Sequence, residues 1–435
     1  MMKILIKNGH VIDTLEELDG KYDIMIEDGK IVEIKKKIQV ENEDIELIEA
    51  EGKIIYPGLI DMHTHLREPG FEEKETIKTG CEAAAAGGFT RVACMPNTNP
   101  AVDNPASVEY IKSKASEAVI EVLPVGSITK KREGKELAEL GFLAEAGVKA
   151  VSDDGNPVMN GEIMRRAMEY GDNFNLKIIS HCEDLNLASD GVMNEGYYST
   201  ILGLKPIPAA AEETMIARDI MLAEFTGASL HIAHLSTKRG LELVADAKKR
   251  GVNVSAEITP HHFSLTDKAV KSYDPNTKVN PPLRAKKDVE ALREGISQGI
   301  IDIIATDHAP HTYEDKLGEF NYAENGISGI ETALALVNTN LVKEKIIDYK
   351  ELLKLMYENP INLFDLDKKG IKENQLADLI VFDPDKEWEV KTEEFKSKGK
   401  NTPFSGDKLL GKTEITFSNG KMVYDNRGDK AEIIY

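Results

Sequence analysis

The chain has 435 residues and carries 75 Asp and Glu against 54 Lys and Arg, a formal net charge of −21. Such an acidic protein is a poor partner for nucleic acid or an anionic membrane surface. No apolar run reaches the roughly 20 residues that cross a bilayer, and the N-terminus lacks the pattern of a signal peptide, so we expect a cytoplasmic protein. Three cysteines are too few for a disulfide framework.

Both ends of the chain predict short strands that alternate apolar and polar residues. The turn pairs Asn8-Gly9, Asp28-Gly29 and Asn419-Gly420 separate several of them. The predicted strands are Lys3–Lys7, Tyr22–Ile26, Lys30–Ile34, Asp378–Phe382, Thr413–Phe417 and Lys421–Tyr424. Neither end would bury much alone, so we expect residues 1–55 and 366–435 to pair into one small sheet domain.

The region 56–365 shows a different pattern, in which short β-branched runs alternate with helical stretches. The runs are Ile54–Ile60, Thr90–Met95, Val119–Val125, Val148–Ser152, Leu176–Ser180, Ser229–Ala233, Asn253–Ile258 and Ile301–Thr306. The helical stretches include Lys74–Ala86, Glu133–Ala146, Gly161–Tyr170, Ala209–Phe225 and Lys238–Arg250. Eight βα units predict a (β/α)8 TIM barrel. The rival, a doubly wound open sheet, lacks its usual glycine-rich nucleotide motifs here.

Polar residues gather where the predicted strands end, which is where the active site of a barrel lies. His63 and His65 close the first strand and share one face of it. Two parallel imidazoles suit a divalent cation of the zinc type. His181 and His234 end two neighbouring strands and are expected to hold a second metal. His231, three residues before His234, is expected to be structural.

A binuclear site needs a bridging anion. We expect Asp153 to bridge the metals, with its neighbour Asp154 as the alternative, because a strand end cannot be assigned to one residue from sequence. A carbamylated Lys149 would lie on the same strand face, but four residues deeper. Asp307 ends the last strand and is expected to act as general base and then general acid. Zinc lowers the pKa of a bound water to about 7, so the site predicts hydrolysis, or its reverse, at a C–N or similar acyl bond.

Arg67 follows His65 by two residues and is expected to face the same cavity. Its guanidinium could bind a substrate carboxylate in a bidentate manner. Asn97, Asn280 and His311 lie on other predicted rim loops.

Several of these motifs resemble the dihydroorotases of the amidohydrolase superfamily. The opening segment Gly58–Gly70 contains HTHLREPG, and the segment 305–311 reads ATDHAPH. Between them lie MPNTNP at 95–100, Asp153-Asp154-Gly155 and KVNPPLR at 278–284, and GKNTPF follows at 399–404. The resemblance covers nearly the whole chain and is closest to the bacterial type that bridges its metals with an Asp.

This resemblance implies a barrel with a small β-sandwich domain built from both termini. It implies two Zn²⁺ ions and reversible cyclisation of N-carbamoyl-L-aspartate to L-dihydroorotate in pyrimidine biosynthesis. The implied metal ligands are His63, His65, Asp153, His181, His234 and Asp307. The implied substrate contacts are His65, Arg67, Asn97, Asn280, His311, Asn325 and Gly326. Asn325 departs from the Phe or Pro that we expect before this glycine in many relatives.

Two other functions fit parts of the pattern. A hydantoinase or allantoinase would share the HxH motif and the barrel, but usually bridges its metals with a carbamylated lysine. A non-catalytic scaffold for aspartate carbamoyltransferase would be expected to have lost metal ligands, whereas all six positions are filled here. A homodimer is the default expectation for a soluble enzyme, and association with aspartate carbamoyltransferase is a further partner hypothesis.

Overall fold

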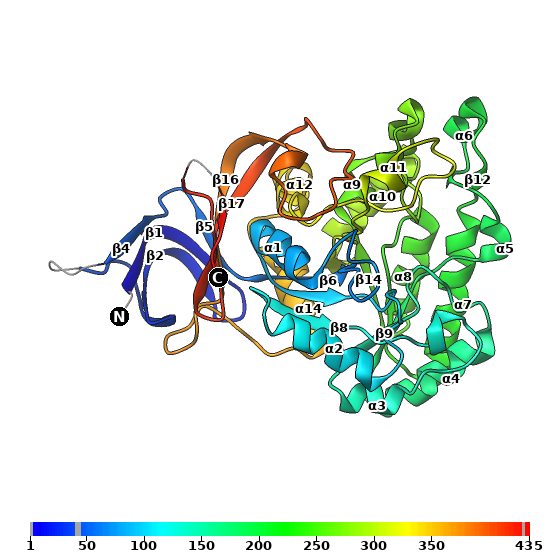
Figure 1. Cartoon of the computed structure of the whole chain (residues 1–435), viewed down its shortest axis with the longest axis horizontal. Coiled ribbons are helices and arrows are strands. Elements are labelled where there is room, and N and C mark those ends of the chain that lie inside the picture. Colours follow the sequence, from blue (N-terminus) through cyan, green and yellow to red (C-terminus); the bar gives the residue numbers. More distant parts are fainter. Residues whose placement is uncertain (1–2, 40–44, 429–430) are drawn as a thin grey trace.

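The computed structural model describes residues 3–39, 45–428 and 431–435. Strands from both ends of the chain share one nine-stranded sheet, in the order β19-β18-β17-β16-β5-β1-β2-β3, with β4 paired to β1. Figure 1 shows the N-terminal and C-terminal strands side by side at one end of the molecule. The bounds are β1 Lys3–Asp13, β2 Leu18–Glu27, β3 Lys30–Lys35, β4 Glu46–Glu49, β5 Ile54–Pro57, β16 Leu379–Glu389, β17 Lys408–Ser418, β18 Lys421–Asp425 and β19 Glu432–Ile433.

Two of the three predicted turns are confirmed. Asp28-Gly29 connects β2 to β3 and Asn419-Gly420 connects β17 to β18, each with both residues at positive φ, as hairpin turns favour. The prediction of a turn at Asn8-Gly9 is wrong. β1 continues through these residues with an irregular register against β2, and the Asn8 backbone N–H donates to Asp23 Oδ1 at 2.8 Å. The pair marks a bulge rather than a chain reversal.

Eight parallel strands form the predicted barrel. Their bounds are β6 Leu59–Thr64, β7 Phe89–Cys94, β8 Glu121–Pro124, β9 Ala150–Ser152, β10 Lys177–Ser180, β13 Leu230–Ile232, β14 Val254–Ile258 and β15 Ile303–Ile304. Parallel bridges at Gly126–Val151 and Thr64–His308 join the two arcs of strands and close the ring. The predicted run Ile54–Ile60 is in fact divided: β5 belongs to the terminal sheet and β6 begins the barrel after Gly58.

Helices follow the barrel strands on the outside (Figure 1). The longer ones are α1 Ile77–Gly87, α2 Pro105–Ala115, α4 Gly161–Asp172, α7 Ala210–Thr226, α8 Lys238–Lys249 and α10 Lys286–Ser297. Short helices on the connections are α3 Leu140–Glu145, α5 Leu185–Ala188, α6 Tyr197–Leu202, α9 Pro260–Ser264, α11 Tyr313–Lys316, α12 Ala333–Val337, α13 Tyr349–Leu353 and α14 Asn359–Phe364, and β11 Met193–Asn194 pairs with β12 Pro206–Ile207. Among the described residues, no helix combines the length and the apolar character needed to cross a membrane.

The helix predicted over Glu133–Ala146 is only partly present. Its second half forms α3. The first half instead pairs with residues 128–130: the Ala138 N–H donates to the Ile128 carbonyl, and the Lys130 N–H donates to the Glu136 carbonyl. Lys131 and Arg132 have positive φ, and the chain reverses here, between the two segments that these bonds join. The segment therefore folds back on the loop after β8 and supports it.

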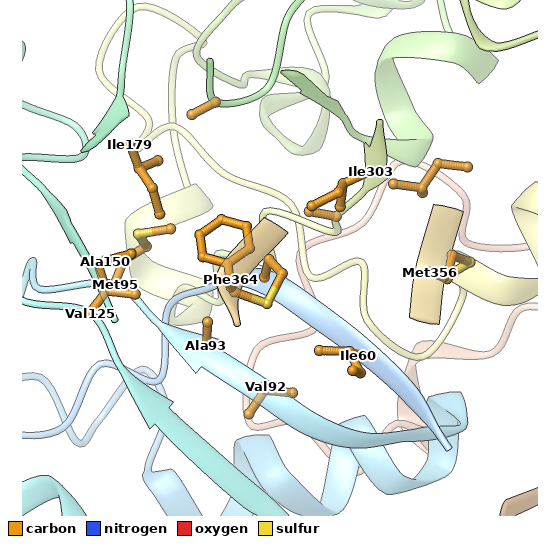
Figure 2. Close-up of a cluster of buried hydrophobic side chains, with 14 of the residues drawn as sticks. Ile60, Val92, Ala93, Met95, Val125, Ala150, Ile179, Ile303, Met356 and Phe364 are labelled. Carbon is orange, nitrogen blue, oxygen red and sulfur yellow. The ribbon is translucent and has the colours of Figure 1, made fainter. Parts of the chain in front are cut away.

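Apolar side chains from several strands fill the barrel interior. Figure 2 shows Phe364 from α14 with Ile60, Ala93, Ile179 and Ile303 around it. All of these residues are almost completely buried and belong to one core cluster. The Phe364 ring also meets the ring of His231 edge to face, with centroids 5.4 Å apart. The polar strand ends therefore adjoin a barrel interior packed with buried apolar side chains.

Candidate metal centre

His63 and His65 lie at the end of β6, and both imidazoles are buried. Residues two apart on an extended chain share a face, which brings both rings toward Asp307. His65 Nε2 lies 2.9 Å from Asp307 Oδ1, and His63 Nε2 lies 3.6 Å from the same oxygen. One potential ligand atom from each of these three residues falls within 4.8 Å of the others.

Asp154, rather than Asp153, lies among the histidines. Its Oδ1 is 3.4 Å from His63 Nε2 and 3.6 Å from both His181 Nδ1 and His234 Nε2. Its Oδ2 is 3.6 Å from His65 Nε2. The two oxygens thus face different histidines, as a bridging carboxylate requires.

Asp153 is turned the other way, which corrects the first choice of bridging residue. Its Oδ1 accepts hydrogen bonds from the backbone of Ile128 at 2.9 Å and Thr129 at 3.0 Å, and its Oδ2 accepts from the Thr129 hydroxyl. Successive residues at a strand end point to opposite sides, so only one of the pair can face the site. Burial raises the pKa of Asp153 to about 6 even with these donors.

The lysine alternative is also excluded by position. The Lys149 side chain is about half exposed, and its ammonium lies 3.8 Å from Asp365 on the surface. Lys149 therefore faces the surface, and Asp154 lies among the histidines instead.

His181 and His234 follow β10 and β13, as predicted, and their rings meet with His181 Nδ1 2.9 Å from His234 Nε2. His63, Asp154 and His234 form a second group whose ligand atoms lie within 4.8 Å of one another. His63 Nε2, Asp154 Oδ1 and His181 Nε2 are buried and have no hydrogen-bond partner among the described residues. Buried polar atoms without partners are costly, and imidazole nitrogens with carboxylate oxygens are the donors that zinc prefers. These residues therefore fit one or two divalent cations.

The backbone is strained at three residues of this site. Arg67, His234 and Asp307 have φ values of 62°, 32° and 49°, a region that residues with a side chain rarely adopt. Each lies just beyond a barrel strand, where the chain must turn sharply. Burial opposes ionisation of Asp307, but the hydrogen bond with His65 and the nearby His63 lower its pKa to about 2. Asp307 is therefore a carboxylate at neutral pH.

A buried carboxylate that we did not single out from the sequence lies beneath these ligands. Glu257, the second-last residue of β14, lies 2.5 Å from His63 Nδ1 and 3.1 Å from His231 Nε2, and it accepts from the His234 backbone N–H at 3.1 Å. It is completely buried. The available signal was a glutamate in an otherwise uncharged strand. His231, assigned a structural role, contacts this carboxylate and Ser255.

Arg67 and His311 lie together beside the histidine cluster. Arg67 Nη2 is 3.2 Å from His311 Nε2, and Arg67 Nε donates to the Pro310 carbonyl at 3.2 Å. His311 Nε2 is also 2.8 Å from the Asn325 carbonyl oxygen. Burial and the positive charges of Arg67, Lys316 and Lys74 lower the pKa of His311 to about 3, so its ring is neutral at physiological pH.

The two rim asparagines are each fixed by a residue of the site. His65 Nδ1 lies 2.8 Å from Asn97 Oδ1, and Asn280 Nδ2 donates to Glu183 at 3.0 Å. Glu183 in turn lies 3.7 Å from His181 Nε2 and was another residue not assigned from the sequence. Asn97 thus retains its amide N–H groups for a ligand, and Asn280 retains its carbonyl oxygen.

Gly326 approaches the site so closely that a side chain would not fit. Its φ is 141°, and a Cβ would lie 2.8 Å from the Ala309 carbonyl oxygen and 3.1 Å from His311 Nε2. The predicted substrate segment 325–326 is therefore in contact with His311. The structure brings together every predicted site residue except Asp153.

A closed parallel barrel with histidines and carboxylates at its strand ends defines an enzyme of the amidohydrolase class. The fold is similar to L-hydantoinase (dihydropyrimidinase) from Arthrobacter aurescens, with a TM-score of 0.86 at 24% identity, covering 100% of this chain and 98% of that one. It is also similar to dihydropyrimidinase from Brevibacillus agri NCHU1002, with a TM-score of 0.85 at 23% identity, covering 99% and 97%.

Sequence comparison gives the particular family. The dihydro-orotase-like family model matches residues 52–240. The dihydroorotase of Thermoanaerobacter sp. (strain X514) is 52% identical over 99% of this chain and 100% of its own length. That of Syntrophus aciditrophicus (strain SB) is 52% identical over 97% and 99%. The chain belongs to the dihydroorotase family.

Proposed function

We propose that this protein catalyses the reversible hydrolysis of the cyclic amide of L-dihydroorotate to N-carbamoyl-L-aspartate, a step of pyrimidine biosynthesis. Relatives named dihydroorotase that are 52% identical over nearly the whole chain support the reaction. The observation that carries it within the structure is the Arg67–His311 pair beside the metal centre. A guanidinium next to a neutral imidazole suits a substrate that carries a carboxylate close to the bond that is cut.

We propose two Zn²⁺ ions as cofactors. His63, His65 and Asp307 would hold one ion, and His181 and His234 the other, with Asp154 between them. When bound, such ions supply an activated water at neutral pH and polarise the carbonyl under attack. His63 is near ligand atoms of both groups, so its placement affects both ions.

Asp307 would move the proton. As a carboxylate at the end of β15, it can accept a proton from the attacking water and then pass it to the ring nitrogen that leaves as the C–N bond breaks. In the reverse direction the same carboxyl group takes the proton from the attacking carbamoyl nitrogen. His65 Nε2 lies 2.9 Å from Asp307 Oδ1, so both side chains would border the site of this transfer.

The remaining rim residues would bind the substrate. Arg67, Asn97 and His311 would hold the carboxylate, and Asn280 would contact the substrate from the opposite loop. The backbone of Asn325-Gly326, which packs closely against Ala309 and His311, would face the pyrimidine ring. Cytoplasmic location, a homodimer and association with aspartate carbamoyltransferase stay predictions from the sequence.

Turnover of L-dihydroorotate and hydantoin, measured side by side with zinc-loaded protein, tests this proposal. We expect turnover of dihydroorotate and little or none of hydantoin, which has no carboxylate for Arg67. Turnover of hydantoin alone would retain the metal chemistry and reject the substrate. Turnover of neither, by protein with full metal content, would favour the scaffold role.

A further inference from the structure

Two buried lysines join the rim loops that carry Asn280 and Asn325-Gly326. Lys278 and Lys316 have side chains near the rim, yet their exposed fractions are only 6% and 8%. Within the described residues neither ammonium group forms an ion pair with a carboxylate. Lysine is seldom buried without such a partner, so these two positions require another explanation.

Both ammonium groups donate to backbone carbonyls instead. Lys316 Nζ donates to Glu324 O at 2.6 Å, and to Pro275 O at 3.2 Å and Lys278 O at 3.4 Å across the loop. An ammonium group has three donors, and all three are used here. Lys316 therefore links the turn at 275–278 to the segment that ends at Gly326.

Lys278 completes the same connection from the other side. Its Nζ donates to Ala323 O at 2.7 Å and to Asn321 O at 2.9 Å. Its own backbone carbonyl accepts from the Gly326 N–H at 2.9 Å. Two side chains and one backbone bond thus connect residues 321–326 to the chain around Lys278, two residues before Asn280. His311 and Asn401 hold the end of the same segment at the Asn325 and Gly326 carbonyls.

We infer that Lys278 and Lys316 are positioning residues that hold Asn280 and Asn325-Gly326 at the spacing needed to bind the substrate. The inference rests on the proposed function, in which these three residues contact the substrate. Neither lysine touches the metal centre, so their loss should affect substrate binding and leave metal binding intact. This separates them from the residues of the centre itself.

The test uses Lys278→Met and Lys316→Met, which keep an unbranched side chain one atom shorter and remove its donors. Lys287→Met, at an exposed position on α10, is the matched control. We expect KM for dihydroorotate to rise about tenfold or more in both variants, as for loss of a charge-assisted hydrogen bond. We expect kcat to change much less, with zinc content unchanged. KM values equal to the control would overturn the inference.

A second measurement does not depend on turnover. Hydrogen exchange of the peptide covering 317–327 should be faster in both variants than in the wild type and in Lys287→Met. Unchanged exchange would overturn the inference, even if KM rose. If the wild type failed to turn over dihydroorotate, the proposed function would fall, and exchange would still decide whether the lysines hold the segment.

Chemical rescue tests whether the amine donors of Lys316 are required, rather than only the volume of its side chain. Lys316→Cys treated with 2-bromoethylamine regains an amine on a side chain of nearly lysine length. The three native cysteines are buried, and treated wild type is the control. With alkylation of the introduced thiol verified by mass spectrometry, we expect rescue of KM and of slow exchange, and failure of both would contradict the role of the donors. If Lys316→Met does not fold, Lys316→Gln offers a smaller loss of donors for the same comparison.

Discussion

Glu257 Oε1 lies 2.5 Å from His63 Nδ1, on the side of the imidazole that faces away from the proposed metals. This contact leaves Nε2 directed at Asp154 and Asp307. A carboxylate behind a ligating histidine fixes the tautomer and the ring orientation and makes the ligand more basic. Glu257 also accepts from the His234 backbone, so it connects both halves of the centre.

Replacing Glu257 with Gln should weaken metal binding by about 10–100-fold, the range seen when such supporting groups are lost. Competition with a coloured chelator measures this directly. Glu242→Gln, at a partly exposed position on α8 where the carboxylate pairs with Arg239, is the control. An unchanged dissociation constant would show that His63 needs no support from Glu257.

Asp154→Asn and Asp153→Asn should behave differently although the residues are adjacent. Asp154→Asn removes the charge that faces four histidines, so we expect loss of bound metal and of activity. Asp153→Asn should retain its metal and lose stability, because its carboxylate supports the Ile128–Thr129 backbone. Metal stoichiometry and thermal unfolding of the two variants test this prediction. Loss of metal from Asp153→Asn, with metal retained in Asp154→Asn, would contradict it.

Asp307→Ala should abolish turnover and leave part of the metal bound. The side chain offers one ligand atom, whereas His63 and His65 remain. Stopped turnover with measurable zinc would support proton transfer by Asp307. Near wild-type activity would eliminate Asp307 as the general base.

Arg67→Ala should raise KM for dihydroorotate by tenfold to over a hundredfold, since a hydrogen bond to a charged group contributes about 1.5–3 kcal/mol. Arg67→Lys should recover only part of this loss, because an ammonium lacks the bidentate geometry. Steady-state kinetics measure this change in KM. A KM close to that of the wild type would show that the substrate carboxylate binds away from Arg67.

The stability of the protein should depend on pH through His311. Its pKa is lowered from 6.5 to about 3 in the folded protein, so between these values the unfolded chain binds more protons. The free energy of unfolding should therefore fall as the pH decreases from about 6.5 toward 3. His311→Gln should lose less stability than the wild type between pH 7.5 and 4.5 in urea titrations. Parallel curves for the two proteins would contradict a neutral, buried His311.

The positions of most site residues could be predicted because they depend on strand ends. Apolar runs followed by histidine or aspartate mark where each barrel strand stops, and all such ends meet on one face. His63, His65, His181, His234 and Asp307 follow from this rule. The choice between Asp153 and Asp154 does not, because it depends on which of two successive side chains turns inward.

Other features depended on tertiary contacts that the sequence does not display. Glu257 sits inside a strand, where only its pairing with His63 and His231 explains a buried charge. The Asn8-Gly9 pair has the composition of a turn, yet pairing of β1 with β2 on both sides makes it a bulge. The run Ile54–Ile60 reads as one strand but serves two sheets, because Gly58 lies between β5 and β6.

The barrel closes where β6 meets the chain after β15, through the Thr64–His308 bridge and the His65 N–H bonded to the His308 carbonyl at 2.8 Å. His65 and Asp307, which meet at this seam, are separated by 242 residues. During synthesis the N-terminal part leaves the ribosome first. His63 and His65 therefore emerge long before Asp307, the carboxylate that they contact in the folded protein. A chain that ends before residue 307 would lack Asp307, and the group of His63, His65 and Asp307 could not form.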